Sequence, residues 1–204
     1  MTLCESLPRE TFREGSIPVL ETTRLTLRGP RLEDAKAVAA LANDRRIAEN
    51  TARIPHPYKL LDAKNFIGGA NKSDKESVFL VTARTGAEKN TILGACGVTL
   101  IDGEAPELGY WLGVPHWGKG YATEALHAVI DYAFETLGHD QLNAGARVTN
   151  PASRRVLEKC GFQWTGVGLY RINSIKSSAP IDRFRLDRGI WSAIKAWHPS
   201  KRVM

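Results

Sequence analysis

The alternation of apolar and polar residues predicts a set of short strands in this chain. Leu25 and Leu27 alternate with polar residues in the run 23–28, which stops at Gly29-Pro30, and this is the pattern of a half-buried strand. Three further strands are predicted, joined by short turns: residues 77–84, 92–101 and 107–112. Because strands connected by short turns pair antiparallel, we expect these three to form one antiparallel sheet.

Apolar residues at helical spacing predict helices around these strands. In residues 32–41 the apolar positions share one face, and Glu33 and Asp34 suit the positive end of a helix. Further helices are predicted for residues 45–51, 60–66 and 122–137, for a segment that Asn150 caps and Gly161 ends, and for a last helix that carries Trp191, Ile194 and Trp197. Gly138 is well placed to stop the helix 122–137.

The order of these elements predicts a mixed sheet. The helix 122–137 connects the strand 107–112 to a strand at 142–148, and a helical crossover of this kind places its two strands parallel. Strands at 162–172 and 181–186 follow, with a polar loop at 173–180 between them.

Length and composition indicate one globular domain. The chain has 204 residues, of which 43% are hydrophobic and 25% charged. We expect residues 1–18 to form a loosely ordered leader and residues 19–204 a single domain. The chain contains no run of about 18 apolar residues that could span a membrane, and its N-terminus lacks the apolar core of a signal peptide. We therefore expect a cytoplasmic protein with no membrane partner.

The cysteines do not indicate a disulfide framework or a metal site. Cys4, Cys96 and Cys160 are odd in number and far apart, and no histidine lies near them at ligand spacing. We expect reduced thiols and no bound metal. We interpret Cys160, which follows Val156 and Leu157 on a predicted helix, as a packing residue rather than a nucleophile.

The formal net charge of +6 and an isoelectric point of about 9.3 favour anionic partners. A ligand that carries phosphates and a ribosomal or RNA surface both fit this charge, while a solvated basic face is the simpler interpretation. The sequence has neither the aromatic and basic pattern of an RNA-recognition motif nor a zinc finger.

A glycine turn between the strand 107–112 and the following helix predicts an anion site. Gly118 and Gly120 allow the main chain to approach a ligand closely, and the first amides of the helix from about Tyr121 have no partner within it. Gly113 with Gly118-Lys119 resembles part of a P-loop, but Gly120 stands where that motif needs a magnesium-binding hydroxyl. Thr123 stands where a dinucleotide fingerprint needs its third glycine.

Two motifs together resemble those of the GNAT N-acetyltransferase superfamily. The first is Trp117-Gly118-Lys119-Gly120-Tyr121-Ala122, which is similar to the acetyl-CoA pyrophosphate loop and opens with Trp as in the RimJ and RimL branch. The second is Asn150-x-x-Ser153 followed by Arg155-Val-Leu-Glu-Lys-x-Gly-Phe162. The resemblance covers roughly residues 20–190. It implies a mixed α+β fold with a central, mostly antiparallel sheet flanked by helices, whose strands splay apart at the acetyl-CoA site.

The resemblance also implies how acetyl-CoA is held, without a metal. The pyrophosphate would lie on the amides of residues 118–123, with Lys119 adding charge, and the pantetheine where the strands 107–112 and 142–148 splay. Backbone groups near Leu112 and Val114 would bond the pantetheine amides, and an N–H there could polarise the thioester carbonyl. The residues assigned to acetyl-CoA are Leu112, Gly113, Val114, Trp117, Gly118, Lys119, Gly120, Tyr121, Ala122, Thr123, Asn150 and Ser153.

Glu107 and Ser153 are the candidate catalytic residues. The family places a carboxylate on the strand before the loop, and Glu107 occupies that position as a candidate base, although it could simply be a solvent-facing glutamate. Many relatives carry a tyrosine, seven residues after the motif asparagine, that protonates the leaving thiolate. Here that residue is Leu157, so Ser153 or a water near Asn150 is the candidate instead.

The loops 53–58 and 173–180 are expected to shape the acceptor pocket. Ile54-Pro55-His56-Pro57-Tyr58 is a rigid turn that we expect to present an exposed aromatic ring and an imidazole. His56 and Tyr58 are therefore candidate acceptor-binding residues, with a surface histidine as the simpler interpretation of His56.

We expect an enzyme that acetylates a primary amine, which is either a protein N-terminus or a small molecule such as a polyamine or an aminoglycoside. Ribosomal association is a further expectation, as is a monomer or a homodimer. The alternative is a non-catalytic module that binds or senses acetyl-CoA. A nucleotide-binding protein is disfavoured by Gly120.

Overall fold

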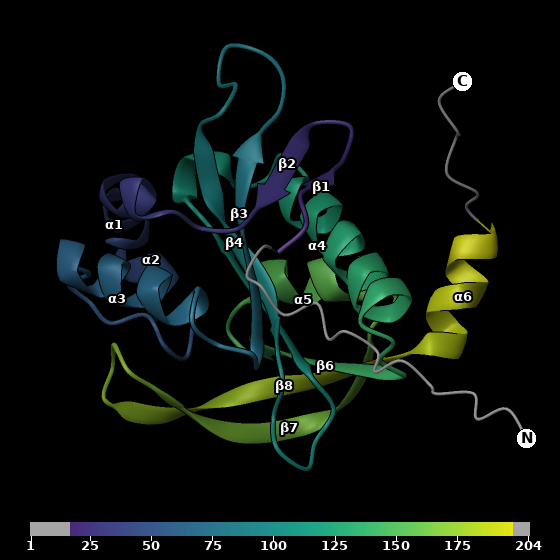
Figure 1. The fold of residues 1–204 in the computed structure, drawn as a ribbon. Helices are drawn as coiled ribbons and strands as arrows, with labels where there is room; N and C mark the ends of the chain where they lie inside the picture. The colour runs from purple at the N-terminus through teal and green to yellow at the C-terminus, as the bar shows by residue number, and fades with distance from the viewer. Residues whose placement is uncertain (1–16, 198–204) are drawn as a thin grey trace, which may run out of the picture.

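The computed structural model describes residues 17–197, which form one sheet flanked by helices (Figure 1). The strands are β1 (Leu20–Glu21), β2 (Leu25–Arg28), β3 (Glu76–Ala83), β4 (Ile92–Thr99), β5 (Glu107–Leu112), β6 (Gln141–Arg147), β7 (Gln163–Ile172) and β8 (Ser177–Asp187). The helices are α1 (Ala35–Ala42), α2 (Arg45–Ala48), α3 (Leu60–Ala70), α4 (Tyr121–Asp131), α5 (Pro151–Lys159) and α6 (Arg188–Trp197). Short turns of 3₁₀ helix precede α1 and α4, at Leu32–Asp34 and Val114–His116, and a π-helical turn, Tyr132–Thr136, continues α4.

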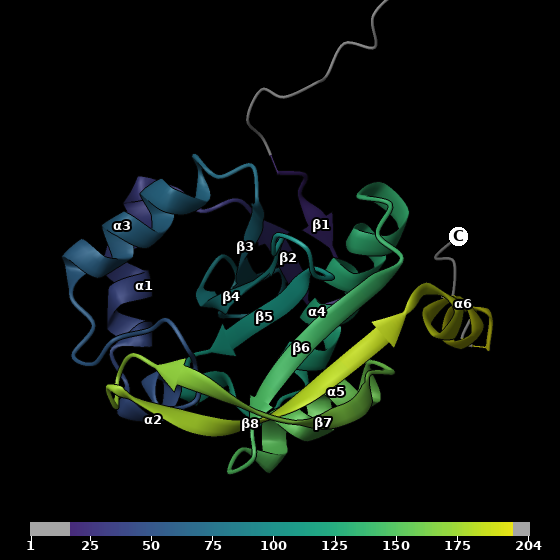
Figure 2. The same cartoon turned by 90° about the horizontal axis from the view of Figure 1, so that it is seen from below.

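The eight-stranded sheet is mixed and mostly antiparallel, in the order β1-β2-β3-β4-β5-β6-β8-β7. Among the strands of residues 17–197, only β5 and β6, which α4 and its π-helical turn connect, pair in parallel. Their pairing is short: Glu107 lies opposite Asn143 and Leu108 opposite Ala144, and beyond these residues the two strands separate (Figure 2). The sequence prediction of a mixed sheet that splays at this point is confirmed.

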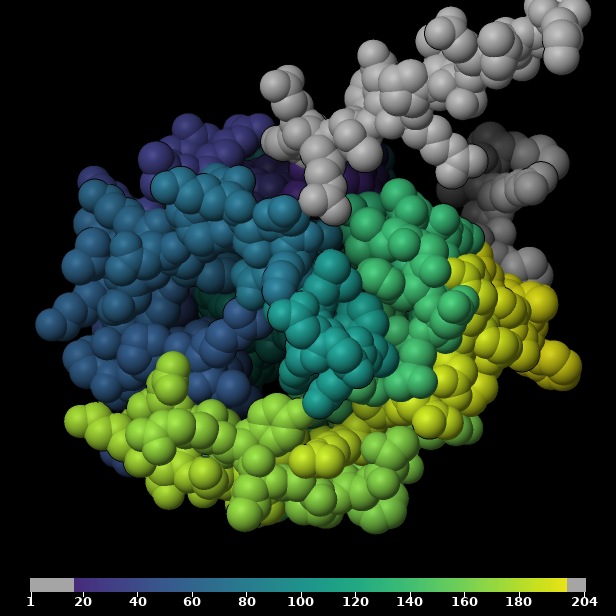
Figure 3. Space-filling model, turned by 60° about the horizontal axis from the view of Figure 1, so that its bottom comes forward, coloured from purple at the N-terminus to yellow at the C-terminus, as the bar shows by residue number. Residues whose placement is uncertain are grey.

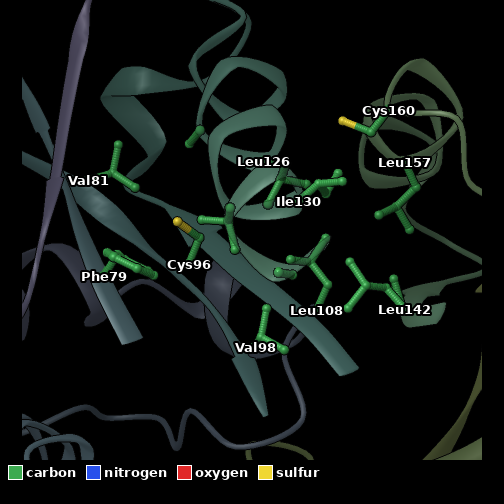
Figure 4. Close-up of a cluster of buried hydrophobic side chains, with 14 of the residues drawn as sticks. Phe79, Val81, Cys96, Val98, Leu108, Leu126, Ile130, Leu142, Leu157 and Cys160 are labelled. Atoms are coloured by element: carbon green, nitrogen blue, oxygen red, sulfur yellow. The ribbon is translucent and has the colours of Figure 1, made fainter. Parts of the chain in front are cut away.

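Two apolar layers cover the two faces of the sheet (Figure 1). On one face α4 and α5 pack on the strands, with buried residues such as Phe79, Leu126 and Leu142 (Figure 4). Cys160 belongs to this layer, and so its expected packing role is confirmed. On the other face α1 and α3 bury Val38 and Ile67.

The β7–β8 hairpin is longer than the sequence predicts. The expected polar loop at 173–180 is wrong, because β8 already begins at Ser177 and only residues 173–176 form the turn. Ala179 and Ile181 alternate inward and form a small buried cluster with Ile172. This cluster holds the polar residues Ser177 and Ser178 in a strand.

Some helix boundaries also differ from the prediction. The third helix continues to Ala70, because Ile67 and Ala70 extend its buried face beyond the predicted end at residue 66. The second helix is a single turn that ends at Ala48. Gly138 follows α4 and its π-helical turn with a positive φ of 74°, and it ends them as predicted.

Residues 1–16 and 198–204 lie outside the described residues, and so do Cys4 and most of the expected leader. At the start of the described chain, Ile17 packs against the larger apolar layer. Cys96 and Cys160 are buried free thiols. Between residues 17 and 197, none of the helices combines the length and the apolar character that crossing a bilayer requires.

Candidate active site

The glycine turn before α4 has the backbone conformation that the anion-site prediction requires. Gly118 and Gly120 have φ values of 73° and 78°, a region that side chains with a Cβ rarely adopt. A Cβ added to Gly118 would meet no atom within 4 Å, so the main chain is open on that side. Gly120 directly precedes α4, and the unpaired first amides of this helix belong to the same turn.

Arg24, which directly precedes β2, is distant in sequence from this turn but holds it in place through hydrogen bonds. Its Nη1 donates to the Lys119 carbonyl at 2.9 Å, and its Nε donates to Glu124 at 2.6 Å. The guanidinium also lies 4.7 Å from the centre of the Tyr121 ring. Burial raises the pKa of Glu124, but hydrogen bonds from Thr22 and Arg24 outweigh it and leave the pKa below its ordinary value. The turn is therefore held by an ionised pair.

The chain between β5 and the turn is fixed by its own hydrogen bonds. The Trp117 indole donates to the Leu112 carbonyl at 2.7 Å, and the Gly113 amide donates to the Leu93 carbonyl at 2.8 Å. A Cβ on Gly113 would lie 2.5 Å from Leu41 Cδ2, so a larger residue there would displace the end of the Leu41 side chain. The Gly113 amide is thus already used, while the Leu112 carbonyl keeps a second lone pair for a ligand.

One large cavity, of about 1140 Å³, joins the glycine turn to the splay of β5 and β6 and to the loops beside α2 and α3. Figure 3 shows a hollow between the α3 region and the β7–β8 hairpin. The predicted site residues that line the cavity are Tyr58, Glu107, Leu112, Trp117, Gly118, Gly120, Tyr121, Ala122, Thr123, Asn150 and Ser153. Gly113, Val114, Lys119 and His56 are not part of its lining.

Glu107 begins β5 and is half-buried in the cavity wall. Burial raises the pKa of its carboxyl; Arg53 opposes this shift and Glu104 adds to it, and the net pKa lies above the ordinary value. Arg53 itself pairs with Glu76 and donates to the Thr99 hydroxyl. A carboxylate with a raised pKa is suited to accept a proton near neutral pH.

Ser153 meets a tyrosine from the facing strand. Its Oγ lies 2.8 Å from the Tyr110 hydroxyl, and both residues line the cavity. Asn150 accepts a hydrogen bond from the Ser153 amide at 3.1 Å, so its predicted capping of α5 is confirmed. Burial raises the pKa of Tyr110 to about 12, and its hydroxyl therefore stays protonated at neutral pH. Leu157 is fully buried in the core.

One side of the cavity is bounded by the end of α2, the segment that follows it and the β7–β8 hairpin. The hairpin turn is fastened to that segment: the Asn173 amide donates to the Ala52 carbonyl at 3.0 Å, and Ser174 Oγ donates to the Ala48 carbonyl at 2.9 Å. Tyr170 and Ile172 of the hairpin line the cavity, whereas residues 173–180 do not.

The two candidate acceptor-binding residues of the predicted turn 54–58 lie in different places: Tyr58 lines the cavity, and His56 faces solvent. The expectation of an exposed aromatic ring is wrong, because Tyr58 is buried against α1 and α3. The Tyr58 backbone amide donates a hydrogen bond to Asn43 Oδ1 at 2.9 Å. His56 is exposed.

A family model described as an acetyltransferase (GNAT) domain matches residues 24–163. The chain belongs to the GNAT acetyltransferase family. Among curated proteins it is 32% identical, over 152 residues, to the uncharacterized N-acetyltransferase p20 of Bacillus licheniformis, a match that covers 72% of this chain and 84% of that protein.

Solved structures share the GNAT fold. Spermidine N-acetyltransferase from Vibrio cholerae, in complex with CoA and spermine, has a TM-score of 0.70 at 23% identity, over 84% of this chain and 99% of the other. RimJ from Mycobacterium smegmatis, in complex with CoA-disulfide, also has a TM-score of 0.70, at 17% identity, over 87% of this chain and 89% of the other. At these identities the likeness concerns the fold.

Three residues that this GNAT site brings together were not predicted from the sequence. Arg24 and Tyr110 are separated in sequence from the groups they contact, and no local pattern pairs them. For Tyr110 the sequence offered one signal. Tyr110 is three residues after Glu107 on the same strand, so the two side chains lie on opposite faces of the sheet and Tyr110 faces α5. His116 lines the cavity as well, and burial lowers its pKa, which favours its neutral form.

Proposed function

We propose that this protein transfers the acetyl group of acetyl-CoA directly to a primary amine. The observation that carries the proposal is the single cavity in which the glycine turn, the splay of β5 and β6, and Glu107 meet. An anion site, a slot between strands and a carboxyl with a raised pKa are the parts that such a transfer needs.

The residues of the turn fit the phosphates of coenzyme A. Gly118 leaves the main chain open, and the amides of residues 121–123 would hold the pyrophosphate with Lys119 nearby. The slot between β5 and β6 would take the pantetheine, since beyond Leu108 and Ala144 these two strands no longer pair with each other. Acetyl-CoA supplies the activated acetyl group, and we propose that it binds without a metal.

Glu107 serves as the proton acceptor for the attacking amine. The amine nitrogen forms a bond to the carbonyl carbon of the thioester, the bond from that carbon to sulfur breaks, and the proton of the amine passes to the Glu107 carboxylate directly or through water. Burial keeps this carboxyl basic enough for the task.

Ser153 serves as the proton donor to the leaving thiolate. Tyr110 stays protonated and lies 2.8 Å from Ser153 Oγ. With Tyr110 as the donor of this hydrogen bond, the Ser153 hydroxyl hydrogen would remain available to the departing sulfur. Asn150 fixes the first turn of α5 and with it the position of Ser153. Tyr110 and Ser153 together would thus protonate the leaving thiolate, the role of the tyrosine that many relatives carry at the position of Leu157.

The acceptor is a protein N-terminus or a small-molecule amine, and the reaction takes place in the cytoplasm. The net charge of +6 also suits association with a ribosomal surface, by a monomer or a homodimer. The spermidine N-acetyltransferase from Vibrio cholerae acts on a polyamine, and this does not identify the acceptor of the present chain. The cavity described above is lined by side chains of both charges, among them Arg46, Arg53 and Glu76.

An array of peptides and small amines, assayed for free thiol with acetyl-CoA, tests this proposal. We expect thiol release that depends on the amine and persists when a chelator is present. Tight acetyl-CoA binding measured by calorimetry, with no thiol release for any amine, would instead identify a module that binds or senses acetyl-CoA.

A further inference from the structure

Arg147, the last residue of β6, bridges the sheet and the end of α2 inside the cavity. It lines the cavity wall, and its Nη1 donates to the Glu49 carbonyl at 2.8 Å. Residues 141, 143, 145 and 147 share one face of β6, and the residues on the other face, such as Ala144 and Ala146, are buried against α4 and α5. Arg147 therefore projects to the acceptor side of the splay.

The charge of Arg147 has no carboxylate partner within residues 17–197. Of the other arginines that line the cavity, Arg46 pairs with Asp44 and Arg53 with Glu76, while Arg155 lies on α5. Arg147 bonds only a neutral carbonyl, and its Nε is buried without a hydrogen-bond partner among the described residues. A half-buried guanidinium with spare donors is an unusual feature, because burying an uncompensated charge is unfavourable.

The carboxylates of the cavity wall are engaged elsewhere. Glu76 pairs with Arg53, and Asp62 accepts from the Lys59 amide at the start of α3. The cation that acts on Glu107 is Arg53, not Arg147. Glu107 lies opposite Asn143, and Arg147 lies four residues further along β6, a rise of about 13 Å. The cavity therefore has a basic pole that is separate from the candidate base.

We propose that Arg147 selects an acceptor amine that also carries an anionic oxygen group, a carboxylate or a phosphate. This inference rests on the proposed acetyl transfer, since it names the class of amine for the same site. A guanidinium presents a planar set of donors that matches both groups. An acceptor of this class would supply the counter-charge that the described residues do not provide, while its amine faces the thioester.

Matched pairs of acceptors test this proposal. The first pair is a dipeptide with a free C-terminal carboxylate and the same dipeptide amidated; the second is 2-aminoethyl phosphate and ethanolamine. We expect kcat/KM of the wild-type protein to favour the anionic member of at least one pair by about tenfold or more, as for a hydrogen bond to a charged group. The pair that shows the preference identifies the group as a carboxylate or a phosphate.

Variants then assign the preference to Arg147. Arg147→Met should remove it by lowering kcat/KM for the anionic member alone, and Arg147→Lys should retain part of it. Arg46→Met is the matched control: it removes the same charge from the same cavity, but from an arginine that already has a carboxylate partner. It should leave the preference in place.

The outcomes separate this inference from the proposed function. If the wild-type protein acetylates neutral and anionic amines equally well, the inference is wrong and acetyl transfer stands. If Arg147→Met slows both members of a pair equally and lowers the melting temperature, Arg147 merely anchors α2 and the inference is again wrong. If no amine is acetylated, the proposed function and the inference fall together.

Discussion

At the scale of single residues, the chemistry proposed for this protein depends on where two ordinary side chains are buried. Glu107 begins a strand, and its partial burial in the cavity wall is the main cause that raises the pKa of its carboxyl, with a smaller contribution from Glu104. Tyr110 is likewise a strand residue whose hydroxyl becomes relevant because Ser153 comes within 2.8 Å of it.

Glu107→Gln should reduce kcat by about 10²- to 10⁴-fold, the usual contribution of general-base catalysis, while acetyl-CoA affinity stays unchanged. Because the pKa of Glu107 lies above its ordinary value, wild-type activity should fall as the pH drops through that raised pKa. The variant should lose this acid limb. A variant that keeps more than about a third of the turnover and the same acid limb would place the base elsewhere.

Glu104→Gln is the matched control for Glu107. The charge of Glu104 raises the pKa of Glu107, so its removal should lower that pKa. The acid limb of the pH–rate profile should then move to lower pH with little change in kcat at neutral pH. An acid limb that moves to higher pH would contradict the assignment.

Tyr110→Phe should lower kcat by about 2- to 10-fold, since it removes one hydrogen bond to Ser153 and leaves the ring in place. In a double-mutant cycle, Tyr110→Phe should have no further effect once Ser153 is alanine, because the phenol acts through that hydroxyl. Tyr132→Phe, in the core beside Phe79, is the control and should leave kcat unchanged. Full additivity of the two substitutions would show that they act independently.

At the scale of elements, the site depends on two helix N-termini that approach the same cavity. The helix α4 begins directly after Gly120, and α5 begins directly after Asn150. The turn before α4 is held by Arg24, and the first turn of α5 is held by the Asn150 cap. Both helices follow sheet strands, β5 and β6, at the point where the strands separate.

Gly120→Val should lower acetyl-CoA affinity by roughly tenfold or more, because a β-branched side chain does not adopt a φ of 78° without strain and would also crowd the ligand's approach. Gly138→Val is the matched control. It introduces the same kind of strain at a φ of 74°, at the far end of the α4 segment. Calorimetry should show weakened binding for Gly120→Val alone, and equal affinities of both folded variants would refute the anion site.

Asn150→Ala should destabilise the protein by about 1 kcal/mol, because it removes the cap of α5. If Asn150 also lines the thioester slot, the Michaelis constant for acetyl-CoA should rise as well. Asn150→Asp keeps a cap acceptor and therefore separates the two effects: a Michaelis constant raised by both substitutions indicates the slot. A constant unchanged in both, after correction for the folded fraction, leaves Asn150 with the cap alone.

At the scale of the whole molecule, the local patterns of the sequence predict most of the fold and part of the site. The period of apolar residues gives the strands and helices, and the crossover between residues 112 and 142 gives the parallel pairing of β5 and β6. The polar run at 173–180 misled the prediction, because Ala179 and Ile181 pack only once the hairpin forms. Arg24 with Lys119, and Arg147 with Glu49, are contacts across the fold that no local spacing encodes.

The most direct test of the account is the balance of acetyl transfer on the best acceptor of the amine array. Thiol released from acetyl-CoA and N-acetylated amine would be quantified together by mass spectrometry, for the wild-type protein and for Glu107→Gln. We expect one N-acetylated amine for each thiol released, at a rate that rises with amine concentration and falls sharply in the variant. Acetyl-CoA that binds at the glycine turn but is never converted with any amine would contradict it.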